Sequence, residues 1–154
     1  MKPIQSWLDE YGESHKNPTN KLIHWICVPS IVFSIILMLS DLFVPKLFSN
    51  LNLNWSQIVM ILAIAYYMFL STSLAIGMTL IFWLMTLLQT FISESTAYPV
   101  WGIGLTVFIL AWIGQFYGHK LEGKKPSFLK DIQFLLIGPL WLLHFVYKRF
   151  NIST

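Results

Sequence analysis

Residues 47–93 form an uninterrupted stretch that contains no Asp, Glu, Lys or Arg. A helix that crosses a bilayer takes about 20 residues, at a rise of about 1.5 Å per residue. The stretch therefore has room for two crossings, which we place at 55–75 and 77–92. Charged residues make up only 11% of the whole chain, whereas soluble domains have about 25%. We predict a membrane protein, because so few charges cannot cover a water-exposed surface.

Three further apolar segments extend this prediction. Residues 22–44 and 98–117 are each long enough to cross, whereas 132–148 is short and contains Gly138-Pro139. A break of this kind favours a kinked or re-entrant helix over a straight crossing. Every segment should be helical, because unpaired backbone groups cannot face lipid. The predicted fold is an all-α polytopic membrane helical bundle. It has four crossings and a short kinked or re-entrant fifth helix, in a single domain over 1–154.

The distribution of lysines predicts the orientation in the membrane. Lysines occur in the polar segment 1–21 and in the basic loop 118–131, and only Lys46 lies between them. Four crossings return the chain to its starting side, so both basic groups share one face. The positive-inside rule makes that face, and the N-terminus, cytoplasmic.

Residues 1–21 do not resemble a cleavable signal peptide, because no apolar core and cleavage site are present. The chain is therefore expected to be a multi-pass protein of the bacterial inner membrane or the endoplasmic reticulum. No basic patch interleaved with aromatic residues points to nucleic acid. The oligomeric state is left open.

The same topology places histidines together. His15, His24 and His119 come to one membrane face, and His144 joins them only if the fifth segment is re-entrant. Neutral imidazoles with a carboxylate are typical ligands of non-haem Fe(II) and of Zn(II). A lone histidine at a helix end is, however, commonly an interfacial side chain, and no dense HxxxH or HExxH motif occurs. The residues alone therefore support a membrane bundle with a hypothetical metal site.

Residues around His119 admit two interpretations. Gln115, His119 and Glu122 lie at i, i+4 and i+7, on one face of a helix. Gln115 suits a packing role between helices, and Glu122 suits either the site or an ion pair with Lys124 or Lys125. The basic run 120–130 would face lipid headgroups or hold a substrate carboxylate. Cys27 is interpreted as a small packing residue.

Two motifs resemble the signatures of a known family. The stretch HKNPTNKLIH covers residues 15–24 and is followed by Val28-Pro29. The stretch QFYGHKLEGKKP covers residues 115–126 and is followed by Gly138-Pro139. In order and hydropathy, essentially the whole chain resembles the fungal-type 2-hydroxy fatty acid dioxygenases. These are small membrane proteins that convert products of phytosphingosine breakdown into odd-numbered fatty acids.

The resemblance implies an Fe(II)-dependent dioxygenase of fatty acid α-oxidation. Its partners would be a 2-hydroxy fatty acid, which it shortens by one carbon, O₂ and the lipid bilayer, without 2-oxoglutarate. The family motifs carry His15, His24 and His119 over as iron ligands, with His144 as a fourth candidate outside them. Glu122 and Lys120 are the catalytic candidates, the first as a carboxylate near the ligands. Lys120, Lys124 or Lys125 would offset the substrate carboxylate.

Two alternatives belong to other classes of function. A Zn(II)-dependent membrane lipid hydrolase would use the same histidines without O₂. A non-enzymatic membrane assembly protein would need no metal, and alanine at the three motif histidines would leave its function intact.

Overall fold

The computed structural model describes residues 2–42, 53–123 and 128–154, with side chains of the last range from residue 133 onward. Helices account for almost all of these ranges, and no strand occurs among them. The helices are α1 (Ile4–Glu13), α2 (Pro18–Ser40), α4 (Trp55–Leu70), α5 (Thr72–Ser95), α6 (Val100–Glu122) and α7 (Phe128–Arg149). The predicted all-α class is confirmed.

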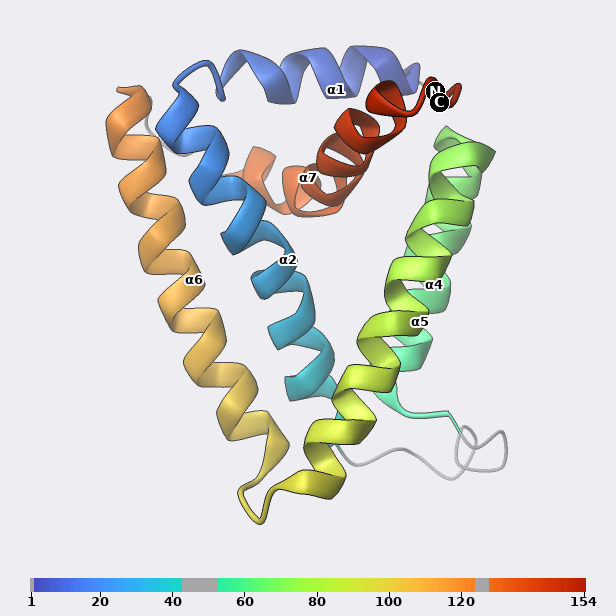
Figure 1. The fold of residues 1–154 in the computed structure, drawn as a ribbon, viewed down its shortest axis with the longest axis vertical. Helices are drawn as coiled ribbons and strands as arrows, with labels where there is room; N and C mark the ends of the chain where they lie inside the picture. The colour runs from blue at the N-terminus through green and yellow to red at the C-terminus, as the bar shows by residue number, and fades with distance from the viewer. Residues whose placement is uncertain (1, 43–52, 124–127) are drawn as a thin grey trace.

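Four helices run along the molecule and two lie at one of its ends (Figure 1). Helices α2, α4, α5 and α6 follow one another in alternating directions, with α2 beside α6 and α4 beside α5. Helix α1 lies across one end, which we call the α1 end, and α7 stays in the same half of the molecule. The start of α2, the end of α6 and both chain termini therefore meet at the α1 end.

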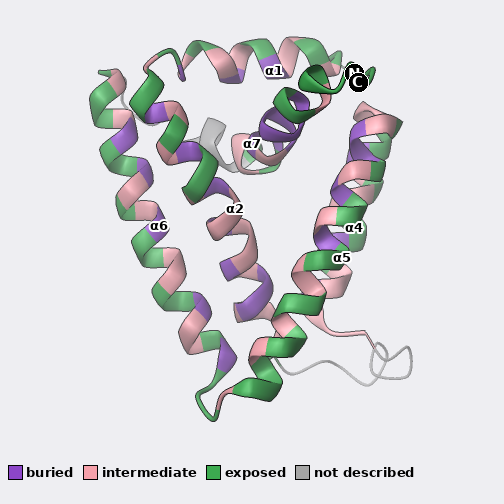
Figure 2. Cartoon of the chain, in the orientation of Figure 1, coloured by how far each residue is buried: buried purple, intermediate pink, exposed green. Residues whose placement is uncertain are grey.

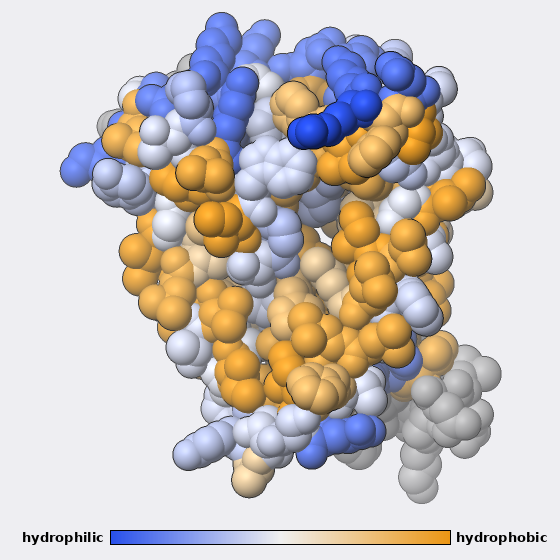
Figure 3. All heavy atoms as spheres, in the orientation of Figure 1, coloured by the Kyte–Doolittle hydropathy of each residue, from blue (hydrophilic) through white to orange (hydrophobic). Residues whose placement is uncertain are grey.

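The outer surface of the long helices is apolar. Among the described helices, α2, α5 and α6 are long and apolar enough to cross a membrane, and α4 is apolar but shorter. Phe69, Ile76 and Phe91 leave 65–75% of their surface exposed. Figure 3 shows apolar residues across the middle of one face, most of the hydrophilic residues at the α1 end, and a smaller hydrophilic group at the opposite end. A surface of this extent is typical of contact with lipid.

Helix bounds differ from the predicted ones mainly at the α1 end. Part of the polar segment 1–21 is the amphipathic helix α1, which buries Leu8 and Tyr11. Helix α2 starts at Pro18, because the Asn17 side chain accepts hydrogen bonds from the first backbone N–H groups and proline suits the first turn. Helix α6 continues to Glu122 instead of residue 117. Residues 43–44 of the first predicted crossing and 124–127 of the basic loop, including Lys124 and Lys125, lie outside the described residues.

Glycines let α2 and α6 approach each other closely. A Cβ added to Gly104 would lie 2.8 Å from the Ser34 carbonyl oxygen, and one added to Gly114 would lie 2.6 Å from Cys27 Sγ. Gly114 and Gly118 form the GxxxG spacing, which permits close packing of membrane helices. Cys27 is half-buried in this contact, in agreement with its interpretation as a packing residue.

Helix α7 fills the space beneath α1. It contains Pro139 and carries the buried Ile137, Leu140 and Trp141, which belong to the main hydrophobic core. Figure 2 shows this concentration of buried residues on α7. The Tyr67 hydroxyl of α4 donates a hydrogen bond to the Leu136 carbonyl at 2.9 Å, in the turn that precedes Pro139. The helix is therefore anchored on several sides close to its proline.

Candidate metal centre

Three histidines from different elements converge at the α1 end. His15 lies in the turn after α1, His24 in α2 and His119 in the last turn of α6. One ligand atom of each lies within 4.8 Å of the others. The ring centroids are 4.1 Å apart for His15 and His24, and 5.2 Å apart for His24 and His119. His15 and His24 are buried and His119 is half-buried.

Backbone carbonyl groups fix the tautomers of two of these rings. The Nδ1 atom of His15 lies 2.6 Å from the Tyr11 carbonyl oxygen, and that of His24 lies 2.9 Å from the Asn20 carbonyl oxygen. A carbonyl oxygen can only accept, so each Nδ1 is the donor and each neutral ring has its lone pair on Nε2. Histidines that bind metals in proteins are commonly oriented in this way.

Tyr11 and Trp141 form one wall of the histidine group. The Tyr11 ring stacks on the His15 ring, with centroids 4.3 Å apart and an interplanar angle of 11°. The Trp141 ring centroid lies 5.2 Å from that of His15. A Cβ on Gly138 would lie 2.9 Å from the Tyr11 hydroxyl, so this glycine makes room for the tyrosine. Gly138 of the Gly138-Pro139 motif thus contributes to the site by leaving space for Tyr11.

Glu122 joins the end of α6 to the start of α2. Its carboxylate accepts hydrogen bonds from the backbone N–H groups of Lys16 at 2.8 Å and Asn17 at 3.0 Å, and from Asn20 Nδ2 at 2.9 Å. The backbone carbonyl of the same Asn20 holds His24. Glu122 is not a member of the histidine group among the described residues. It therefore positions the chain that carries the ligands.

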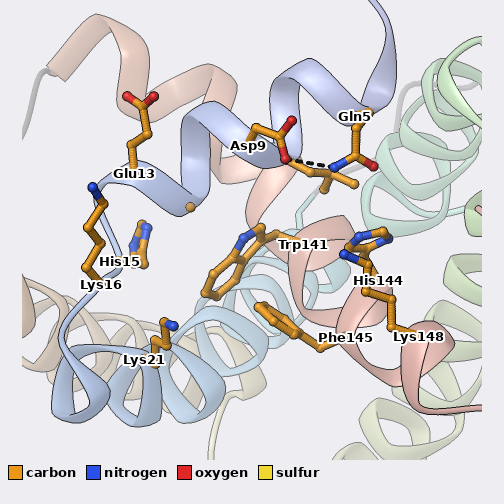
Figure 4. Close-up of a pocket in the computed structure, with 12 residues that line it drawn as sticks. Gln5, Asp9, Glu13, His15, Lys16, Lys21, Trp141, His144, Phe145 and Lys148 are labelled. Carbon is orange, nitrogen blue, oxygen red and sulfur yellow. Dashed lines mark hydrogen bonds between the residues drawn. The ribbon is translucent and has the colours of Figure 1, made fainter.

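A polar cavity of about 360 Å³ adjoins the histidine group. His15, Lys16, Lys21, Trp141, His144 and Lys148 are among the residues that line it. Figure 4 shows His15, Lys16 and Lys21 on one side of Trp141, and His144 and Lys148 on the other. The basic groups beside the histidines therefore come from α2 and α7 and from the turn before α2.

The remaining predicted residues lie apart from the three histidines. Lys120 is exposed on the last turn of α6 and does not line this cavity. Gln115 is buried on α6, near Gly114 and Gly118. His144 is buried in the cavity wall and is not one of the three converging histidines. Burial, followed by the positive charge of Lys148, lowers the pKa of His144 below its ordinary value, while Asp9 opposes the shift.

The sequence prediction missed Tyr11, Asn20, Lys21 and Trp141 as contributors to this region. Asn20 and Lys21 lie inside the N-terminal motif, and Tyr11 lies one helical turn before His15. Trp141 lies two residues after Pro139 of the Gly138-Pro139 motif. Their positions near the motif residues could have identified these four residues from the sequence. The sequence does not reveal, however, that α1 packs on α7 and brings Tyr11 and Trp141 together.

The donor set suits a transition metal ion. Imidazole suits iron and zinc alike, and three histidines are a ligand set of catalytic Zn(II). Among the described residues no carboxylate completes the two-histidine, one-carboxylate set that is common for non-haem Fe(II). The backbone contacts of His15 and His24 leave Nε2 as the atom that would bind the metal. A three-ligand site leaves coordination positions for substrate. The residues present therefore fit a catalytic metal.

The fold and the histidine group define an all-helical protein of membrane type with a candidate three-histidine metal centre. The family model described as 2-hydroxy-palmitic acid dioxygenase Mpo1-like matches residues 1–150, and the chain belongs to this family. A relative, 2-hydroxy-palmitic acid dioxygenase MPO1 of Saccharomyces cerevisiae, is 30% identical over 148 residues, which cover 94% of this chain and 80% of the yeast protein. No solved structure matches the chain. The family expected from the two motifs is confirmed.

Proposed function

We propose that this protein is an Fe(II)-dependent dioxygenase that shortens 2-hydroxy fatty acids by one carbon. The overall reaction would be RCH(OH)COOH + O₂ → RCOOH + CO₂ + H₂O, which balances without 2-oxoglutarate or another reductant. The observation that carries the proposal is the convergence of His15, His24 and His119 in a chain of this family. The name of the yeast relative, a 2-hydroxy-palmitic acid dioxygenase, supports the substrate class.

The three histidines would hold the metal. Fe(II) bound there would supply exchangeable coordination positions and the one-electron chemistry that O₂ requires. The Tyr11 and Asn20 carbonyl groups keep the His15 and His24 rings in the tautomer that exposes the Nε2 lone pair. The Tyr11 and Trp141 rings pack against His15 and limit the access of water from that side.

We also propose that the α1 end lies at the cytoplasmic face of the membrane. Several basic residues belong to segments at this end, namely Lys16, Lys21, Lys120, Lys148 and Arg149. An excess of basic residues marks the cytoplasmic side of membrane proteins. In this arrangement α2, α4, α5 and α6 are the four crossings, with α4 as the shortest. A lipid substrate could then bring its carboxylate to the metal centre while its tail remains in the bilayer.

The first test is the iron content of the anaerobically purified protein, together with O₂ uptake on addition of 2-hydroxypalmitate. We expect stoichiometric iron, equal consumption of O₂ and substrate, and release of a fatty acid one carbon shorter. His119→Ala should lose both iron and O₂ uptake. His144→Ala is the matched control for iron content and should keep its iron, because His144 lies outside the ligand group.

Other outcomes would point to the alternative functions. Bound zinc with O₂-independent hydrolysis of a lipid ester would replace the dioxygenase with a hydrolase on the same ligands. A folded protein that takes up neither metal, after Fe(II) and Zn(II) are resupplied, would contradict both enzymes and leave a non-enzymatic membrane protein.

A further inference from the structure

A second cavity lies on the contact between α2 and α7. It has a volume of about 140 Å³ and is lined by apolar and aromatic side chains from α2, α5 and α7. Trp25, Val28, Val32, Met85, Leu142 and Val146 are among them. Trp25 and Val146 are 42% and 37% exposed, so the cavity is a crevice that opens on the surface of the apolar helices.

The apolar crevice directly follows the polar cavity beside His15. Lys21 lines the polar cavity, and Trp25, one turn further along α2, lines the crevice. On α7 the neighbouring residues Phe145 and Val146 line the polar cavity and the crevice respectively. The rings of Trp25 and Phe145 lie side by side at this boundary, with centroids 6.4 Å apart and an interplanar angle of 48°. A polar site and an apolar site therefore succeed each other along one contact between two helices.

This inference rests on the proposed function and specifies how its substrate binds. We propose that a 2-hydroxy fatty acid lies along the α2–α7 contact, with its head in the polar cavity and its alkyl chain in the apolar crevice. The Lys21 ammonium pairs with the carboxylate, and the Trp25 and Phe145 rings flank the chain where it leaves the polar cavity. The end of a long chain extends into the surrounding lipid.

The charges of the polar cavity suit a carboxylate. Lys16, Lys21 and Lys148 line it together with two acids, Asp9 and Glu13. The Asp9 carboxylate accepts a hydrogen bond from Gln5 Nε2 at 2.7 Å, which satisfies part of its acceptor capacity. The buried His144 Nδ1 has no hydrogen-bond partner among the described residues. A hydroxy acid would bring both an anion and a hydroxyl group to these side chains.

The crevice suits an alkyl chain that comes from the bilayer. Met78 and Met85 of α5 contribute to its wall, and methionine side chains adapt to irregular apolar shapes. A chain already dissolved in lipid gains little hydrophobic free energy by entering the crevice, because both surroundings are apolar. Fit, and not hydrophobicity alone, should then determine which chain lengths bind.

The first experiment narrows the crevice with Val146→Trp. We expect kcat/KM for 2-hydroxypalmitate to fall about 10-fold relative to that for 2-hydroxybutanoate, because overpacking of this size opposes only an alkyl chain long enough to reach the crevice. Val59→Trp is the matched control, since Val59 has a similar exposure of 42% but lies on α4. It should leave the ratio unchanged. Equal losses for both substrates, or the same change in both variants, would overturn the assignment of the crevice.

The second experiment does not need turnover. A 2-hydroxy fatty acid with a photoreactive diazirine in the middle of its chain is bound, irradiated and mapped by peptide mass spectrometry. We expect adducts on crevice residues of α2, α5 and α7, which excess 2-hydroxypalmitate removes and Val146→Trp suppresses. Adducts confined to the outer surface of α4, or insensitive to competition, would contradict the proposal. If the wild-type protein is inactive, the proposed function is refuted. The adduct map would still show where the alkyl chain of the fatty acid binds.

Discussion

The α2–α6 pair and the α4–α5 pair differ in what their side chains must do. The first pair holds the histidine group, whereas the second exposes a large apolar surface. Gly104, Gly114 and Gly118 bring α6 against α2, and the Glu122 carboxylate ties the two helices together at the α1 end. The most apolar part of the helix is 39% buried on α2 and 22% buried on α6, compared with 17% on α5. Lipid contact requires only apolar side chains, whereas the histidine end requires particular atoms at particular distances. The two pairs should therefore respond very differently to substitution.

The largest effect is expected from Gly118→Ala. The new Cβ would lie 2.4 Å from Asn20 Oδ1, so the buried Asn20 side chain would shift, and its hydrogen bond to the Glu122 carboxylate would be disturbed. We expect iron affinity to fall by up to about 100-fold, the upper range for groups that orient metal ligands. Titration of metal-free protein with Fe(II) measures this.

Gly102→Ala is the control on the same helix. The nearest atom to its added Cβ is Pro99 Cγ at 3.8 Å, which is an ordinary contact. Equal iron affinity in the two variants would show that the close α2–α6 contact is not required for metal binding.

A smaller effect is expected from Glu122→Gln. The amide keeps the size of the side chain but loses the charge and one acceptor toward Lys16, Asn17 and Asn20. Iron affinity should fall about 10-fold, because the ligands are positioned and not replaced. Glu94→Gln, on the exposed end of α5, should leave it unchanged. Complete loss of iron in Glu122→Gln would instead indicate that Glu122 binds the metal directly.

The third prediction concerns which lysine pairs with the substrate carboxylate. The sequence predicted Lys120, whereas the structure favours Lys21. Lys21 lines the polar cavity and Lys120 is exposed outside it. Lys21→Met should raise the KM for 2-hydroxypalmitate about 10-fold, as for a lost hydrogen bond to a charged group. Lys120→Met should change it by less than about twofold. The opposite ranking in steady-state assays would restore Lys120 as the residue that pairs with the carboxylate.

The smallest effect is expected on the lipid-facing side. Leu84 of α5 is 51% exposed, and Leu84→Ala should change iron content and O₂ uptake by less than about twofold. Both are measured in the same detergent as the wild type. A tenfold loss would mean that the outer surface of α5 contributes to the site, and the contrast between the two helix pairs would fail.

Much of the arrangement was predictable from the sequence. The charge-free residues 47–93 required helices, because a bilayer offers no partners for unpaired backbone groups. The alternation of helix directions brought His15, His24 and His119 to one end, as their spacing and the expected topology indicated. Their role as iron ligands, the four crossings and the cytoplasmic orientation remain predictions.

The sequence by itself therefore determined the helical class, the family and the end at which the histidines meet. Only the tertiary structure decided that Glu122 anchors Asn20, that Gly138 accommodates Tyr11, and that Lys21 instead of Lys120 faces the cavity. The reason is physical. In lipid, a helix carries apolar side chains both toward its neighbours and toward the bilayer, so hydropathy does not reveal which face packs. The rotation of each helix, and with it every side-chain contact in the site, is set by packing.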